Sequence, residues 1–234
     1  MAACSGPMLA WSAMTGGPMQ VLSRILNGQQ YVANILDQPV SIGTVFRIDD
    51  GQAILASHIN DFDGGVDLRR FTSTGSKGTL KFSESRDVTI SFGASATTNL
   101  GESEVSLKFK RSRSAAGALS DVFVDSLRFD PLLEAFQKLW KRRKYDKYLR
   151  EYFLVFETAT AAAGTLIFSE DRNNEVVLKH KMGAKVTKIA DLASGEFEYV
   201  SNTKRTLESI RNVAHTPLFK AFRFKGNWEP EVLG

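Results

Sequence analysis

Three stretches in the first half of the chain alternate strictly between apolar and polar residues. They cover residues 79–84, 87–97 and 103–110, and their apolar positions are Leu80 and Phe82, then Val88, Ile90, Phe92, Ala94 and Ala96, then Val105, Leu107 and Phe109. Because alternate side chains of an extended strand point to opposite sides, each stretch is predicted to be a β-strand with one apolar and one polar face. The turn residues NLGE at 99–102 predict that the last two strands form an antiparallel pair.

Further strands and one loop are predicted by the same criterion. A hairpin is expected from SIGTVFRI and AILA around the turn at Asp49–Gly51, whereas the polar, glycine-bearing stretch TSTGSKGT is expected to be a loop. The remaining strands are expected over DVFVDSLRF (121–129), Tyr152–Phe168, EVVLKHKM (175–182) and PLFKAFRF (217–224).

Helical periodicity appears in fewer places. An amphipathic helix is predicted over 18–28, and a longer one begins at Asp130 and Pro131, which suit the N-cap and the first turn. Residues 204–212 are also predicted to be helical. The expected class is therefore α+β: a twisted, mostly antiparallel sheet with long hairpins and flanking helices. We expect a single domain over 18–224, between a flexible N-terminal tail (1–17) and a short C-terminal tail (225–234).

The net charge of +4 is small, but the basic residues are concentrated at the end of the second predicted helix. Seven of them occur between positions 138 and 150, with Asp146 as the only acid: Lys138, Lys141, Arg142, Arg143, Lys144, Lys147 and Arg150. Three interpretations stay open, namely a solvated helix end that opposes the helix dipole, a site for anionic lipid headgroups, and a site for nucleic acid.

The sequence offers few residues for catalysis. The three histidines (His58, His180 and His215) lack the spacing of a metal site, and the chain contains no glycine-rich nucleotide-binding motif. Cys4 is the only cysteine, so no intramolecular disulfide can form, and a reducing compartment is expected. We predict no catalytic residue, no metal and no cofactor, and no membrane-spanning helix.

The alternating strands are long enough for a second interpretation. One-sided strands usually pack on the core of a soluble domain, but a membrane-spanning strand needs only about 9 to 11 alternating residues. Residues 87–97 and 103–113 each supply eleven, and Tyr152–Phe168 with 174–182 forms a second long hairpin. Two hairpins cannot close a barrel, so membrane insertion would require many subunits.

The order of these elements resembles the pore-forming domain of gasdermins over about residues 18 to 224. The resemblance rests on MQVLSRIL, EVSLKFKRS, DVFVDSLRF, YLREYFLVFETATAAAGTLIF and PLFKAFRF. Locally, Leu149–Thr158 is similar to the family's hydrophobic strand that follows the long helix, and Ala221–Phe224 is similar to its closing AFR strand.

The resemblance implies a cytoplasmic soluble monomer that binds acidic membrane lipids, forms homo-oligomers and inserts two hairpins into the cell membrane, which causes lytic cell death. It implies headgroup binding by Arg24 and the seven basic residues at 138–150, without nucleic acid. It also implies that one set of side chains faces lipid in the pore: Val88, Ile90, Phe92, Val105, Leu107, Phe109, Leu154, Phe156, Leu166, Phe168, Val176 and Leu178.

Two features depart from most of the family. Only residues 225–234 follow the last predicted strand, so we expect either a processed form released by an activating protease or a short bacterial or fungal gasdermin-like protein triggered by a variant homologue. Cys4 resembles an N-terminal cysteine that is acylated in bacterial members, and an unmodified cysteine is the equal alternative. The competing functional hypothesis is a soluble α+β binding domain that uses the basic helix end for nucleic acid or an acidic protein partner.

Overall fold

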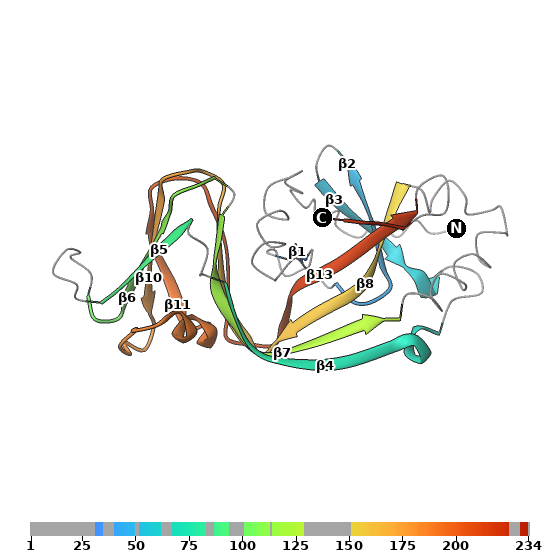
Figure 1. The fold of residues 1–234 in the computed structure, drawn as a ribbon, viewed down its shortest axis with the longest axis horizontal. Helices are drawn as coiled ribbons and strands as arrows, with labels where there is room; N and C mark the ends of the chain where they lie inside the picture. The colour runs from blue at the N-terminus through green and yellow to red at the C-terminus, as the bar shows by residue number, and fades with distance from the viewer. Residues whose placement is uncertain are drawn as a thin grey trace, which may run out of the picture.

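The structure is a computed structural model, and it describes residues 31–34, 40–49, 52–61, 67–82, 87–93, 101–112, 114–128, 151–224 and 230–233. The strands in these ranges form two sheets, and every pairing is antiparallel. Figure 1 shows the smaller sheet folded back beside the larger one at one end of the molecule.

The larger sheet has ten strands and the smaller one has four. The larger sheet contains β1 (Val32–Ala33), β2 (Thr44–Asp49), β3 (Gln52–His58), β4 (Thr72–Phe82), β7 (Ser114–Leu127), β8 (Tyr152–Ala161), β9 (Ala163–Ser169), β12 (Thr206–Arg211), β13 (His215–Phe224) and β14 (Pro230–Val232). The smaller sheet contains β5 (Val88–Phe92), β6 (Glu104–Phe109), β10 (Asn174–His180) and β11 (Phe197–Asn202).

The chain passes from one sheet to the other four times. The strands that continue across have the same order in both sheets. In the larger sheet β4, β7, β9 and β12 lie side by side in that order, and their continuations β5, β6, β10 and β11 do the same in the smaller sheet. The smaller sheet is therefore the continuation of these four strands, folded over. We call the connections the bends, of which the structure describes residues 87, 110–112, 170–173 and 203–205. We call β4, β7, β9 and β12 the proximal halves, and β5, β6, β10 and β11 the distal halves.

The two central strands keep one register through their bends. The last partners on the distal side are Phe109 and Asn174, and the first on the proximal side are Ser114 and Ser169. Four residues separate the two pairs on each strand, so no residue is gained or lost. The same register continues through β7 and β8 to the pair of Ser126 with Glu157. The result is one antiparallel register that stays constant on both sides of the bend, although the ladder itself is interrupted there by four residues on each strand.

The proximal end of this ladder is anchored in a body with apolar side chains on both faces of the sheet. One cluster of this body contains Val45, Leu154 and Phe222, and the cluster on alternate positions contains Phe46, Phe153, Val155 and Phe219. Two 3-10 helices, Ile59–Asp61 and Leu68–Phe71, contribute buried Ile59 and Leu68. A third, η3 (Ile189–Ser194), lies in the connection between β10 and β11.

The predicted α+β class was wrong. Strands account for 65% and helices for 8% of the structure, which is therefore a mostly antiparallel β protein rather than a sheet with flanking helices. The helices predicted over 18–28 and from Asp130 onward lie outside the described residues. The helix predicted over 204–212 is β12, because Thr206–Arg211 pairs along its whole length with β9.

The loop predicted over 72–79 was also wrong, since these residues belong to β4. Its Ser, Thr and Gly residues are mostly exposed, and its backbone pairs with β7 from Thr72 to Phe82. The hairpin predicted around Asp49–Gly51 is confirmed as β2 and β3. The antiparallel pair predicted around residues 99–102 is confirmed as β5 and β6. Within the predicted C-terminal tail, Pro230–Val232 forms β14 against β13.

Candidate functional site

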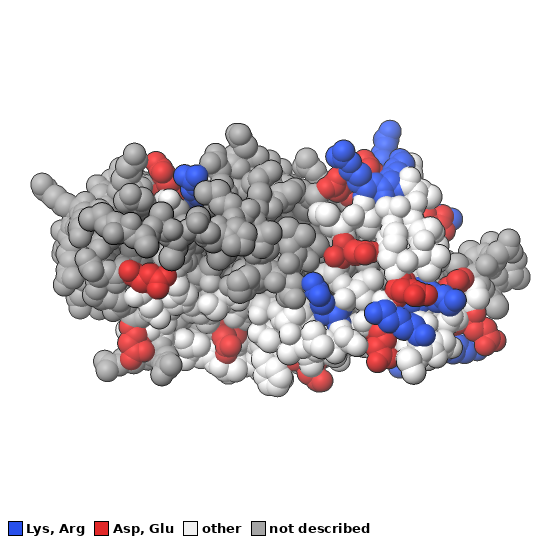
Figure 2. All heavy atoms as spheres, turned by 180° about the vertical axis from the view of Figure 1, so that it is seen from behind, with Lys and Arg blue, Asp and Glu red and all other residues white. Residues whose placement is uncertain are grey.

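The bends carry the charged side chains that interrupt the alternating pattern. Arg111 lies 3.2 Å from Asp87 across the bends of hairpin 72–127, and Arg205 lies 3.9 Å from Glu170 across the bends of hairpin 152–224. Lys204 Nζ donates to the backbone carbonyl of Arg172 at 2.8 Å. Arg111 and Arg205 are largely exposed, and Figure 2 shows acidic and basic side chains intermixed over the end of the molecule where the two sheets stack. We call the following residues of the described bends, all charged and partly or largely exposed, the charged belt: Asp87, Arg111, Glu170, Arg172, Lys204 and Arg205.

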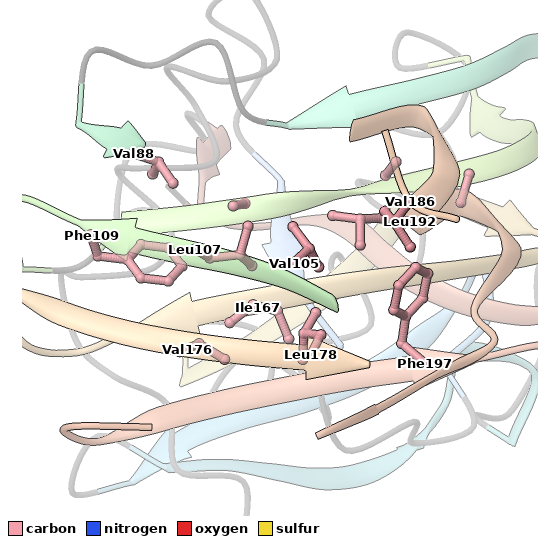
Figure 3. Close-up of a cluster of buried hydrophobic side chains, with 13 residues drawn as sticks. Val88, Val105, Leu107, Phe109, Ile167, Val176, Leu178, Val186, Leu192 and Phe197 are labelled. Atoms are coloured by element: carbon pink, nitrogen blue, oxygen red, sulfur yellow. The ribbon is translucent and has the colours of Figure 1, made fainter. Parts of the chain in front are cut away.

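The distal halves have one mostly apolar and one mostly polar face, with buried Asn174 and His180 on the apolar face at the two ends of β10. The apolar side chains form a single buried cluster with Ala116, Ala118 and Ile167 of the proximal halves. Figure 3 shows members from β6, β9 and β10 gathered between the sheets. The opposite face carries Thr89, Lys108, Glu175 and Lys179, with Lys108 Nζ 3.2 Å from Glu175. The sheet therefore has the one-sided character that alternation predicted.

The predicted lipid-facing residues do not form one surface in the folded molecule. Eight of them belong to the cluster between the sheets or pack against it: Val88, Ile90, Phe92, Val105, Leu107, Phe109, Val176 and Leu178. Leu166 and Phe168 lie in a second cluster on the other face of β9, and Leu154 and Phe156 belong to a third in the body. Phe197 and Tyr199 of β11, which the sequence did not suggest, join the first cluster.

The bends account for this division. In β6 and β7, the residues Phe109, Ala115 and Leu119 have the same sequence parity, so a regular strand would place them on one face. In the folded molecule Phe109 lies between the sheets, whereas Ala115 and Leu119 lie in the cluster on the opposite face. Two of the other long strands follow the same rule. Leu80, Leu166 and Phe168 of the proximal halves share parity with the apolar residues of their distal continuations, yet face the other cluster. Leu207 also faces the other cluster, but there the parity changes at the irregularity in β11 opposite Val177 and Leu178.

The connection between β10 and β11 closes the space between the sheets. Val186 and Leu192 are buried in the same cluster as the distal halves. Asp191 Oδ2 accepts hydrogen bonds from the backbone N–H groups of Thr187 and Lys188, at 2.9 and 3.1 Å, and so fixes the start of η3. At its end Gly195 adopts φ 66° and ψ 12°, and a Cβ placed there would lie 1.7 Å from the Arg211 carbonyl oxygen. Only glycine permits this close approach to β12.

Gly195→Ala is expected to destabilise the protein by about 2 kcal/mol, because a left-handed non-glycine residue costs about 1 kcal/mol and the clash with Arg211 adds a backbone shift. Gly183→Ala is the matched control. Gly183 has φ 69°, but a Cβ added there would meet no atom within 4 Å, so only the conformational cost of about 1 kcal/mol applies. Urea denaturation measures both, and equal losses would show that η3 is not docked tightly on β12.

A buried ionic cluster ties four segments together in the body. Glu157 accepts hydrogen bonds from Lys220 Nζ at 2.8 Å, from the Ser126 hydroxyl at 2.8 Å and from the Tyr31 hydroxyl. The Lys220 ammonium also lies 4.5 Å from the centre of the Tyr31 ring. Burial alone would raise the pKa of Glu157, but the hydrogen bonds from Lys220, Tyr31 and Ser126 outweigh it and hold that pKa below its usual value. The same burial and the neighbouring carboxylate raise the pKa of Tyr31.

The predicted headgroup residues, Arg24 and the basic group Lys138, Lys141, Arg142, Arg143, Lys144, Lys147 and Arg150, lie outside the described residues, as does Cys4. Their placement therefore contributes nothing to the geometry of the site. No helix in the described part of the chain is both long enough and apolar enough to cross a bilayer.

The surroundings of His58 bear on whether this histidine could act in catalysis. His58 lines an open pocket of about 560 Å³ together with Asp125 and several threonines. Its Nε2 donates to the Ile42 carbonyl at 2.8 Å, and its Nδ1 accepts from the Asn60 N–H at 3.2 Å, so backbone groups engage both ring nitrogens. Nowhere among the described residues do three or more His, Cys, Asp or Glu side chains gather where they could hold a metal ion.

No protein-family model matches this sequence, and no curated protein matches it at a significant level. The resemblance to gasdermins therefore rests on the sequence segments named above.

Proposed function

We propose that this protein is a gasdermin-like pore-former that binds acidic phospholipids, oligomerises and inserts its two hairpins into a membrane, causing lytic cell death in fungal allorecognition or bacterial defence. It acts without enzymatic chemistry and without a cofactor. The monomer resides in the cytoplasm and moves to the cell membrane after activation by a protease or by a variant homologue.

The observation that carries this proposal is the constant register of the two central strands on both sides of the bend. Because β6 with β7 and β10 with β9 keep one register across the bend, the central pair can straighten without exchanging a single partner. Straightening would expose the apolar face that the folded molecule keeps between its sheets. Exposure of that face to water is unfavourable by about 25 cal/mol per Å², so a lipid environment is required to accept it.

The edges of the distal sheet support oligomerisation. Its order is β11-β10-β6-β5, so β5 and β11 are its two edge strands. In a membrane every backbone N–H and C=O group must find a partner, and an open edge is excluded. Pairing of β5 in one copy with β11 in the next is a head-to-tail contact of the kind that closes rings.

Dye release from liposomes tests the proposal. The protein, alone and after limited proteolysis, is added to vesicles of phosphatidylserine with phosphatidylcholine, to vesicles containing cardiolipin, and to vesicles of phosphatidylcholine alone. We expect release from the acidic vesicles and none from the neutral ones, because the basic residues of the chain need anionic headgroups. Intact acidic vesicles after both treatments, with the protein shown to be folded, would refute the proposal.

A further inference from the structure

The charged belt divides each long strand into two parts of different character. Distal of the belt, one face is apolar except for Asn174 and His180 at the two ends of β10, and the other is mostly polar, which is close to the pattern of a pore wall between lipid and water. Proximal of it, β7 and β9 bury side chains on both faces: Ala116, Ala118 and Ile167 on one, and Ala115, Leu119 and Phe168 on the other. Only the distal halves therefore have the pattern of a membrane wall.

If β6 with β7 and β9 with β10 were straightened, the charged belt would interrupt the apolar face of each strand. Extending the constant register of the central ladder through its bend places Arg111 opposite Arg172. Both have the sequence parity of the apolar residues, Arg111 that of Phe109 and Arg172 that of Val176. Two arginines in adjacent strands would then point toward lipid, where each costs about 2 to 4 kcal/mol at the bilayer midplane and close to nothing at the interface.

In the folded molecule β6 has six residues and β10 has seven. The turn residues Gly101–Ser103 and Lys181–Met182 lie at the ends of these strands away from the bends, and with them each segment has nine residues. A tilted strand crosses the hydrocarbon with about 9 to 11 residues. The two central segments therefore reach the lower end of this range once the turn residues extend the strands.

We propose, on the basis of the pore-forming function proposed above, that the charged bends lie at the level of the phospholipid headgroups and that only the distal halves, β5, β6, β10 and β11, cross the hydrocarbon. Leu80, Leu154, Phe156, Leu166, Phe168 and Leu207 then stay outside the membrane. Phe197 and Tyr199 join the lipid-facing set. Arg111, Arg172 and Arg205 contact anionic headgroups, and their acidic neighbours Asp87 and Glu170 keep the monomer from binding the membrane through the belt alone.

Single fluorescent labels test this boundary. In a Cys4→Ser background, four partly buried positions are changed to cysteine and labelled with an environment-sensitive dye: Ile90 and Tyr199 in the distal halves, and Leu80 and Leu207 in the proximal halves. A fifth label replaces exposed Arg111. Each labelled protein is mixed with an excess of unlabelled wild-type protein, so that the wild type carries pore formation, and added to phosphatidylserine vesicles with nitroxide quenchers on the acyl chains or on the headgroups.

We expect the emission of the dyes at positions 90 and 199 to rise several-fold when the protein inserts into the vesicles, and to be quenched by acyl-chain nitroxides. The label at Arg111 should respond to headgroup nitroxides only, and those at Leu80 and Leu207 to neither. Acyl-chain quenching at Leu80 and Leu207 during dye release would overturn the boundary while leaving the pore-former intact, as would the lack of quenching at Ile90 and Tyr199. Absence of dye release by the unlabelled protein would instead overturn the proposed function, and the boundary with it.

Discussion

Ile90→Lys is expected to lower the rate of dye release from acidic liposomes by at least about tenfold, while the protein remains folded. Ile90 lies in the middle of β5 and is only partly buried against the cluster between the sheets, so a lysine there can extend its ammonium to water in the monomer. In the proposed pore the same position faces lipid three residues from Asp87 at the headgroup level, so the cost of a lysine in every subunit lies between the interfacial value of up to about 1 kcal/mol and the midplane value of about 2 to 4 kcal/mol. A cost of about 1.4 kcal/mol corresponds to a factor of ten.

Thr89→Lys is the matched control. Thr89 is the preceding residue, is exposed, and points to the polar face of the same strand. Both variants gain one positive charge, so their electrostatic attraction to anionic vesicles is equal. Thr89→Lys should release dye as the wild type does. Circular dichroism checks that both variants are folded, and vesicle sedimentation checks that both bind. Equal dye release by the two variants would exclude that the even-numbered residues of β5 face lipid.

The distal strands could be predicted because their alternation is decided locally. The apolar residues of β5 and β6 pack on one side, and the polar residues lie on the other, where Thr89 and Lys108 are exposed and Ser106 is buried against Glu175, so the period of two is visible in the sequence alone. The first part of β4, residues 72–78, could not be predicted in this way, although its end falls in the strand predicted over 79–84. Its Ser, Thr and Gly residues are typical of loops, and it is a strand because β7, much further along the chain, supplies its hydrogen-bond partners.

The bends were the harder feature to predict. The residues between Phe109 and Ser114 are polar and charged, which indicates a surface position but not that the strand folds back on itself. The equal number of residues in the two central bends becomes visible only when the partners across the ladder are known. The ionic cluster around Glu157 was missed for a similar reason, because Tyr31, Ser126 and Lys220 come from separate segments of the chain with no shared motif.

Glu157→Ala is expected to lower the free energy of unfolding at pH 7 by about 3 to 5 kcal/mol. The substitution removes the acceptor of three hydrogen bonds and leaves the ammonium of Lys220, whose side chain is only 14% exposed, without its carboxylate. Glu231→Ala is the control, because Glu231 pairs with Arg223 at the same distance of 2.8 Å but both side chains are more exposed, at 32% and 40%. An exposed pair is worth about 0 to 1 kcal/mol.

The difference in free energy of unfolding between the wild type and Glu157→Ala should decrease as the pH falls. The pKa of Glu157 is lower in the folded protein than in the unfolded chain, so the unfolded state binds its proton first as the pH falls. The stabilisation is therefore complete above the unfolded value of about 4.3 and is lost as the pH falls through the folded pKa. Urea denaturation between pH 7 and pH 3 measures this. A difference that stayed constant over that range would show that the carboxylate is not held ionised by Lys220, Tyr31 and Ser126.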